Sequence, residues 1–309
     1  MAENIDEMIF MKNRELLQKL KFVEEIIKRK QPGPPTILNK AKRIFSYGPL
    51  YWKHLLVRAK FLPNKDFKAR LFWGEDIHLP LFDSEAFYLA YFGTLWRNQE
   101  LRLTKFLIKN LQPNDVFYDV GASYGFYTRL AYQIVASEGE VHAFEPHPKV
   151  FPYFQKFGEK KVNVFLNNIA LSDKNGESLF IDSLMSGGSS GGSRLSDDLK
   201  KARSGAIVTT STLDSYVNKH KAPTFIKIDV EGAESLVIEG GKEFFKNNSP
   251  VIVMEVWGKE QKIIHSHTVN RLCNMNYKIY KLDENGNISH ESEINFDKLN
   301  DYENFIFKK

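Results

Sequence analysis

The chain has 309 residues, of which 42% are hydrophobic, and a formal net charge of +5. This length suits one large α/β domain, or a smaller one with an appendage, and the modest charge does not indicate nucleic-acid binding. The single cysteine, Cys273, excludes an intrachain disulfide, as in cytoplasmic proteins. The sequence lacks a signal-peptide pattern and any uncharged apolar run of about 18 residues, so we expect a cytoplasmic protein without a membrane span.

Residues 1–35 predict a helix followed by a stiff linker. The helix covers residues 5–30 and carries an apolar stripe at alternating steps of three and four: Ile9, Leu16, Leu20, Val23 and Ile27. Such a stripe fits two arrangements, a homo-oligomer formed through this helix or a helix packed along its own domain. The proline-rich residues 31–35 end the helix and form the linker.

Residues 36–83 form a separate basic and aromatic segment. Between Lys40 and Arg70, nine basic residues stand against one acid, Asp66, and aromatic residues are interleaved with them. This mixture fits peripheral contact with the anionic inner face of a membrane, or the binding of a phosphorylated substrate. A solvated basic face over a core contact is the structural alternative.

Residues 84–309 are expected to form the main domain, in which helical patterns precede the first strand. That strand is apolar except for Asp119, and a turn containing Gly121 and Gly125 follows it. Glycines let the backbone of such a turn approach a ligand closely. The next helix, residues 126–135, offers its free N–H groups to a carboxylate or phosphate.

The acids around this turn indicate which cofactor it binds. Glu145 ends the second strand, 24 residues beyond the first glycine, where a carboxylate can take both hydroxyls of a ribose. Ser123 replaces the middle glycine of a dinucleotide fingerprint, which argues against NAD. An acid two residues before the first glycine, here Asp119, is instead typical of S-adenosylmethionine sites. Tyr124 and Tyr127 either meet the sulfonium through their rings or pack in the core.

A second charged stretch, TFIKIDVEGAE, combines a buried strand with acids near its end. Asp229 would reach the ligand crevice from the carboxyl end of this strand, unless it forms a surface ion pair with Lys227. The next strand holds Glu255 near its end. We expect Asp229 to serve as the base or to orient the acceptor, with Glu231 and Glu255 behind it and His265 as an alternative base.

Other patterns complete the main domain. The Gly/Ser-rich residues 186–195 predict a mobile loop or a lid over the site. Residues 277–282 and 305–307 predict a closing antiparallel pair of strands. His, Cys, Asp and Glu residues do not occur at metal-ligand spacing, so we expect no required metal.

Five motifs occur in order, DVGASYGFYT, FEPHP, NNIALS, STLDSY and IKIDVEGAE, and with them the chain resembles the FkbM family of S-adenosylmethionine-dependent methyltransferases. The resemblance covers roughly residues 84–308. It implies a class I methyltransferase (Rossmann-like) α/β fold, a seven-stranded sheet with an antiparallel last strand, here preceded by an N-terminal helical extension. It also implies O-methylation of a hydroxyl on a sugar, a glycan or a small natural product.

The resemblance further implies the site residues. Asp229 and Glu231 would face the transferred methyl group. Ser123 stands where the family usually has Asn, which puts one cofactor contact in doubt. The positions that would hold the cofactor are Asp119, Gly121, Ala122, Ser123, Tyr124 and Gly125 at its methionine end, Glu145 and Pro146 at the ribose, and Asn168 and Ala170 near adenine.

Two rival functions follow from the residues. One is an NAD-dependent sugar-modifying enzyme, against which Ser123 argues. The other is a non-catalytic domain of the same fold that assembles with a partner through residues 1–83. The acids at the strand ends argue against this second function, because a scaffold does not need them.

Overall fold

The structure is a computed structural model, and its contacts divide the chain into two units, Met1–Leu101 and Arg102–Lys309. It describes residues 2–30, 47–135, 138–159, 161–186, 190, 193–196, 205–258, 261–299 and 301–309. Within these residues, no helix is long and apolar enough to cross a membrane. The predicted linker and several residues of the predicted lid lie outside the described part of the chain.

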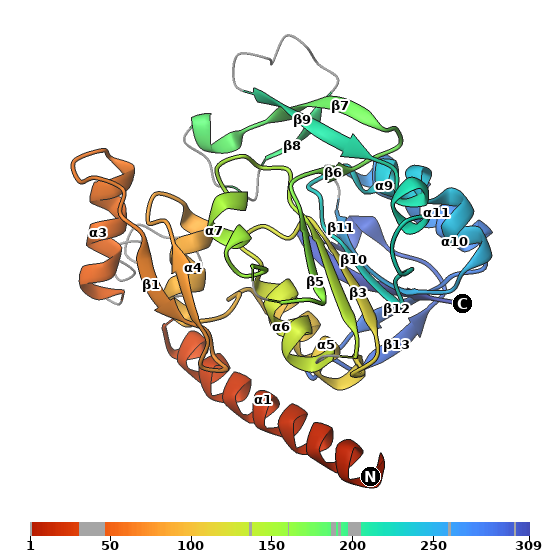
Figure 1. Cartoon of the computed structure of the whole chain (residues 1–309), viewed down its shortest axis with the longest axis horizontal. Coiled ribbons are helices and arrows are strands. Elements are labelled where there is room, and N and C mark those ends of the chain that lie inside the picture. The colour runs from red at the N-terminus through yellow and green to blue at the C-terminus, as the bar shows by residue number, and fades with distance from the viewer. Residues whose placement is uncertain are drawn as a thin grey trace. The chain divides into compact units, whose positions relative to one another are not determined.

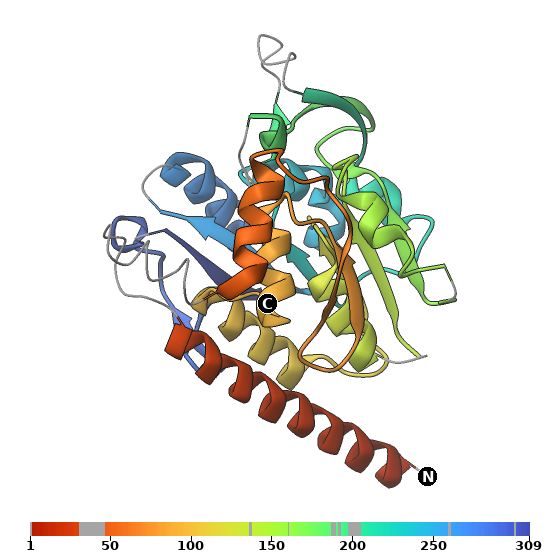
Figure 2. The same cartoon turned by 90° about the vertical axis from the view of Figure 1, so that its left-hand side faces the viewer.

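The first unit begins with one long helix, α1 (Ala2–Lys30), as predicted (Figure 2). The most deeply buried residues of its apolar stripe are Leu16, Leu20 and Ile27. These three side chains are therefore covered within the single chain, and the homo-oligomer through this helix stays a prediction. At the end of α1, the Lys30 ammonium hydrogen-bonds the Tyr91 hydroxyl and lies 4.7 Å from the centre of that ring.

Two short helices and a hairpin complete the first unit: α3 (Gly48–Arg58), β1 (Phe67–Arg70), β2 (Asp76–Leu79) and α4 (Ser84–Phe92). The hairpin was not predicted, because its two strands have only four residues each. Lys68 and Arg70 of β1 both pair with Asp76 of β2, at 2.8 and 2.9 Å. These two basic residues therefore have a partner within the hairpin. Helix α5 (Asn98–Asn110) continues the chain into the second unit.

The second unit is built on an eight-stranded sheet in the order β13-β12-β14-β11-β10-β3-β4-β5 (Figure 1). Its strands are β3 (Val116–Val120), β4 (Glu140–Phe144), β5 (Val164–Asn167), β10 (Phe225–Ile228), β11 (Val251–Trp257), β12 (Lys278–Leu282), β13 (Ile288–Glu291) and β14 (Tyr302–Lys308). Strands β5, β4, β3, β10 and β11 are parallel, and β14 is antiparallel to both of its neighbours. This is the predicted Rossmann-like sheet with an antiparallel last strand.

The expected number of seven strands was wrong by one. The additional strand, β13, pairs antiparallel with β12 at the edge of the sheet. Its sequence, Ile-Ser-His-Glu, has one apolar residue and shows no alternation that would have predicted a strand. The predicted pairing of the strands at 277–282 and 305–307 is confirmed by β12 and β14.

Helices cover both faces of this sheet: α6 (Phe126–Val135), α7 (Phe151–Gln155), α8 (Leu213–Val217), α9 (Glu234–Gly240), α10 (Lys242–Asn247) and α11 (Lys262–Asn274). Strand β3 is buried throughout, as a central parallel strand should be. Because side chains alternate along a strand, Tyr118 packs against Tyr216 of α8, whereas Asp119 points to the other face and bonds Thr128 of α6. One strand thereby joins the core to the site.

A smaller sheet, β6-β9-β7-β8, follows the carboxyl end of β5 (Figure 1). Its strands are β6 (Ala170–Leu171), β7 (Gly176–Ile181), β8 (Arg194–Ser196) and β9 (Gly205–Ser211), and single-turn helices occur at Ser183–Ser186 and Phe296–Lys298. Helices α9 and α10 are separated at Gly241, and the backbone after β6 packs closely against the end of α9. A Cβ atom on Gly240 would lie 1.9 Å from the Ser172 carbonyl oxygen.

Candidate functional site

The glycine turn after β3 is held by the chain itself. Gly121 and Ala122 both donate their N–H groups to the Phe144 carbonyl, at 3.0 Å each. Added Cβ atoms would lie 1.8 Å from the Asp229 carbonyl oxygen at Gly121 and 2.3 Å from the Phe154 ring at Gly125. The two glycines also have positive φ, 82° and 78°. Glycine is therefore required at these two positions because neighbouring segments of the chain pack against them. The turn itself lies at the carboxyl edge of the sheet.

Glu145 ties the turn to the end of β4. Its carboxylate accepts the N–H groups of Ser123 and His147, at 2.7 and 2.8 Å, through different oxygens. Burial raises the pKa of Glu145 to about 7, and these two hydrogen bonds oppose the shift. Each carboxylate oxygen keeps acceptor capacity beyond the backbone donor, which suits a pair of ribose hydroxyls.

Ser123 contributes its main chain to this arrangement. Its φ is 49°, in the left-handed region where Asn is favoured over most residues. This conformation explains why Asn is common at this place in the family that the motifs resemble. The bond to Glu145 uses the Ser123 N–H group, so that contact does not depend on the side chain.

The residues predicted to lie near adenine occupy the ends of β5 and β6. Asn168 donates its amide to the Glu145 carbonyl at 2.8 Å, and Ala170 is buried in β6. Pro146, between Glu145 and His147, is half-buried. Asn168 therefore joins the two strand ends, and its amide oxygen is left to accept a further hydrogen bond.

A row of charges crosses from β3 to β10. Lys227 lies beside Asp119 in the parallel register, and its ammonium is 3.6 Å from Asp119 and 3.0 Å from Asp229. Lys227 is only 2% exposed, so its positive charge is shared between the two carboxylates in a buried setting. The predicted Lys227–Asp229 ion pair is present, but its lysine is buried and does not lie at the surface, and the role of Asp229 in a ligand crevice stays a prediction.

Asp119 is the deepest of these acids. Thr128 donates its hydroxyl to Asp119 Oδ2 at 2.6 Å, while Oδ1 accepts no hydrogen bond from the described residues. Burial raises the pKa of Asp119, and Lys227 and Thr128 oppose this effect. The ammonium of Lys227 also lies 5.2 Å from the centre of the Tyr127 ring. The ring of Tyr124 lies near Tyr153, with 6.2 Å between the ring centres.

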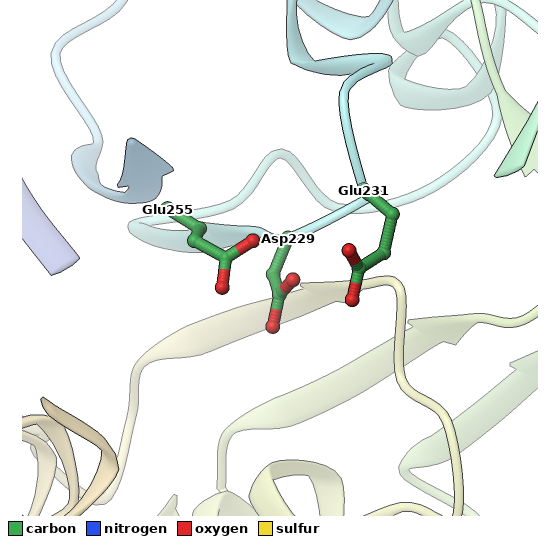
Figure 3. A group of neighbouring side chains, drawn as sticks. All are labelled: Asp229, Glu231 and Glu255. Carbon is green, nitrogen blue, oxygen red and sulfur yellow. The ribbon is translucent and has the colours of Figure 1, made fainter. Parts of the chain in front are cut away.

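Three carboxylates meet at the ends of two neighbouring strands (Figure 3). Asp229, Glu231 and Glu255 each offer an oxygen within 4.8 Å of the other two. Asp229 and Glu231 follow β10, and Glu255 lies in β11, which pairs with β10 in parallel. The sequence predicted Glu231 and Glu255 behind Asp229, and the pairing of β10 with β11 brings Glu255 to the other two acids. Three carboxylates at such distances can hold several hydroxyl groups, or a cation.

His265 lies apart from these three acids. It is fully buried on α11, and its Nε2 atom is 3.2 Å from Gln261 Oε1 and 3.8 Å from Glu234. Burial lowers the pKa of His265 to about 4. The structure thus brings Asp229, Glu231 and Glu255 together and leaves the predicted alternative base in the packing between α9 and α11.

Three residues of the site were missed as contributors. Lys227 was considered only as an ion-pair partner, although its place two residues before Asp229 puts both on one face of the strand. Thr128 and Glu234 are the others: Glu234 accepts the N–H groups of Val230 and Gly232, at 3.1 and 3.2 Å. Glu234 stands at the start of α9, where an acid can accept N–H groups of the preceding turn, and this position was the local sequence signal for its role.

The model of the FkbM methyltransferase domain matches residues 119–279, which are 161 of the 309 residues. The chain belongs to the FkbM methyltransferase family. This match begins at Asp119 and includes the glycine turn, Glu145 and all three clustered acids. No curated protein matches the chain.

Solved structures similar to this FkbM-family chain include an FkbM methyltransferase from Methylobacillus flagellatus, at 12% identity and a TM-score of 0.45. The match covers 74% of this chain and 55% of that one, so the chain spans about half the length of that protein. Fibrillarin from Aeropyrum pernix, with bound S-adenosylmethionine, has 12% identity, coverage of 67% and 74%, and a TM-score of 0.40. An S-adenosylmethionine-dependent O-methyltransferase from Thermotoga maritima has 11% identity, coverage of 67% and 64%, and a TM-score of 0.35.

Membership of the FkbM methyltransferase family implies S-adenosylmethionine as the cofactor. The residues present fit this cofactor. Asp119 Oδ1 is a buried acceptor without a hydrogen-bond donor among the described residues, which suits the cofactor's ammonium group. Glu145 provides the carboxylate that two ribose hydroxyls require.

Proposed function

We propose that this FkbM-family enzyme methylates a hydroxyl group, with Asp229 taking the hydroxyl proton. The observation that supports this proposal best is the group of three carboxylates at the ends of β10 and β11. When bound, S-adenosylmethionine supplies an activated methyl group. The chain must then align an acceptor oxygen and accept the proton that leaves it as the new carbon–oxygen bond forms.

Asp229 suits the second task because of its setting. Its side chain is 25% exposed, so an acceptor can reach it, while Lys227 holds one of its oxygens. Glu255 is held by the indole N–H of Trp257, at 2.7 Å. These contacts fix both carboxylates before an acceptor arrives, which keeps them aimed at the same place.

The same geometry favours an acceptor with several hydroxyl groups. Ionised carboxylates only accept hydrogen bonds, and each of the three can take a different hydroxyl. An anionic acceptor would be repelled by the three acids. We therefore propose a sugar, a glycan or a small polyhydroxylated natural product as the substrate class.

The cofactor residues follow from the geometry of the turn. We assign Asp119 to the ammonium group, the turn from Gly121 to Gly125 to the methionine end, and Glu145 to the ribose hydroxyls. Asn168 and Ala170 then border the adenine. These assignments are supported by the contacts of Glu145, which joins the turn after β3 through Ser123 and the end of β5 through Asn168.

The test is methyl transfer from labelled S-adenosylmethionine to a panel of sugars, glycans and extracts, with the product identified by mass. Asp229→Asn keeps the shape of the side chain and removes its charge. Turnover should fall about 100-fold or more, the usual effect of losing general acid–base help, while cofactor affinity stays within a few-fold. Asp297→Asn changes an exposed acid and is the matched control. Label found on nitrogen or carbon, or full turnover by Asp229→Asn, would contradict this proposal.

A further inference from the structure

Helix α3 of the first unit presents two unlike faces. One face is buried: His54 bonds the Leu81 carbonyl at 2.6 Å and stacks on Phe87. The opposite face exposes Trp52 and Leu56, which are neighbours on a helix because they are four residues apart. Helix α3 is thus anchored by one side, and Trp52 and Leu56 on its outer side are exposed.

The turn after α3 enlarges this apolar face. Phe61 and Leu62 both donate their N–H groups to the Leu56 carbonyl, at 2.9 and 3.3 Å, so the chain folds back over the helix end. Trp52, Leu56, Phe61 and Leu62 are 50%, 40%, 77% and 39% exposed. We call these four residues the α3 patch. Isolated exposed apolar residues are common, but four that are gathered at one helix end mark an interaction surface.

The segment that carries the α3 patch is rich in basic residues. Residues 47–65 contain four cationic residues and no acid. Arg58 bonds the hydroxyl of Ser84, whereas Lys53, Lys60 and Lys65 are exposed and have no acidic partner among the described residues. These three lysines therefore differ from Lys68 and Arg70 of the hairpin, which both pair with Asp76.

This combination fits one kind of partner. Aromatic and aliphatic side chains that project from a helix end can enter the boundary between lipid headgroups and acyl chains. Lysines beside them meet the negative charge of anionic headgroups, and their flexible stems let the ammonium groups stay in water. The most exposed side chain of the patch, Phe61, lies in the turn after α3 and is 77% exposed, so it can enter a lipid interface.

We propose that the α3 patch, with Lys53, Lys60 and Lys65 around it, docks the enzyme on an anionic phospholipid surface. This contact would hold the protein at a membrane without a spanning segment, so an acceptor carried on or near the lipid would be concentrated at the enzyme. The proposal rests on the first unit alone and is independent of the proposed methyl acceptor.

Flotation of the full chain with vesicles tests the proposal. The chain should float with vesicles of phosphatidylcholine containing phosphatidylserine at low salt, and not with phosphatidylcholine alone. High salt should release it, because salt screens the lysines. Trp52→Ser/Phe61→Ser and Lys53→Gln/Lys60→Gln/Lys65→Gln should each lower the partition coefficient about tenfold or more.

Two controls distinguish binding through the α3 patch from non-specific hydrophobic adsorption to vesicles. Phe22→Ser changes a 66% exposed aromatic residue on α1 and should bind vesicles as the unchanged chain does. Cofactor binding should be equal in all variants, which shows that they are folded. The proposal fails if the unchanged chain ignores anionic vesicles at low salt, or if both patch variants float normally. It also fails if light scattering shows that the patch variants lose a dimer while vesicle binding is absent.

Discussion

At the scale of single residues, Lys227 is the buried cation that contacts two acids of the site, Asp119 and Asp229. Its ammonium is nearly inaccessible to water and lies between Asp119, which we assign to the cofactor, and Asp229, which we propose as the base. A buried cation between two carboxylates costs desolvation energy that only their attraction offsets. The residue therefore couples the two halves of the site through charge.

Replacing Lys227 by Met should be strongly destabilising. The change leaves two carboxylates near each other without their cation, and breaking a buried pair in this way costs about 3–5 kcal/mol. Adding Asp119→Asn to Lys227→Met should restore part of that loss, since it removes one of the unpaired charges. Urea unfolding of the two single variants and the double variant measures this coupling, and strictly additive losses would show that the pair is not energetically linked.

Glu145 should make cofactor affinity depend on pH. Its pKa is raised to about 7 by burial, and hydroxyl donors stabilise its ionised form, so binding should lower the pKa and release a proton. Affinity should therefore rise roughly tenfold between about pH 6 and about pH 8, because each unit of pKa shift corresponds to a factor of ten.

Calorimetry with 5′-methylthioadenosine isolates this effect, because that probe has the ribose and adenine but no titrating amino-acid end. Glu145→Gln cannot ionise, and its affinity should be weaker and flat across the same range. A slope that persists in Glu145→Gln would assign the titration to another group.

At the scale of elements, the turn between β10 and α9 is shaped by an acid that takes no part in the proposed chemistry. Glu234 accepts the N–H groups of Val230 and Gly232 through one oxygen, and the turn places Glu231 at a positive φ of 54°. Holding a non-glycine residue in this region costs on the order of 1 kcal/mol. The Glu234 bonds offset that cost and set where Glu231 stands.

Glu234 should lower stability as the pH rises. Burial raises its pKa from 4.5 to about 7, so the folded state holds the proton more tightly than the unfolded state. Its favourable contribution is therefore complete below about pH 4.5 and is lost as the pH rises to about 7. Glu145 acts in the same direction, whereas the buried His265 and His142, with pKa values lowered to about 4, act in the opposite direction.

Glu234→Gln should therefore become more stable relative to the unchanged chain as the pH rises from about 4.5 to about 7. The gain should be about 2–3 kcal/mol, because the Gln oxygen can still accept both N–H groups without ionising. Urea unfolding across this range measures the difference, with Glu239→Gln on the exposed side of α9 as the control. Equal pH profiles for Glu234→Gln and the unchanged chain would contradict the role assigned to burial.

At the scale of the whole molecule, the sequence predicted best where local pattern and burial agree. The strand–turn–helix from Phe117 to Val135 is present with its predicted order, because its apolar runs and glycines leave few alternatives. The close packing of Gly240 against the Ser172 carbonyl was not predictable from the sequence pattern, since Ser172 lies on a distant segment. Glu255 reached the acid cluster through pairing between strands, which spacing along the chain does not encode.

The first unit was the least predictable part for a physical reason. Its hairpin is short, and the segment was described by charge and aromatic content instead of by periodicity. The charge count from Lys40 to Arg70 treated all of its basic residues alike, because Asp76 lies outside that range. Lys68 and Arg70 are paired across the hairpin, while the lysines around the α3 patch have no acid within residues 47–65.

The contacts of the glycine turn determine which of its positions can tolerate substitution during evolution. Its contacts with Phe144 and Glu145 run through main-chain N–H groups at positions 121–123, so side chains there are restrained only by space and by the sign of φ. Ser123 can then exchange with Asn or Gly at little cost, whereas Glu145 and Gly125 cannot change without a compensating partner. Natural variation at the cofactor turn should therefore accumulate at position 123, leaving its two anchors fixed.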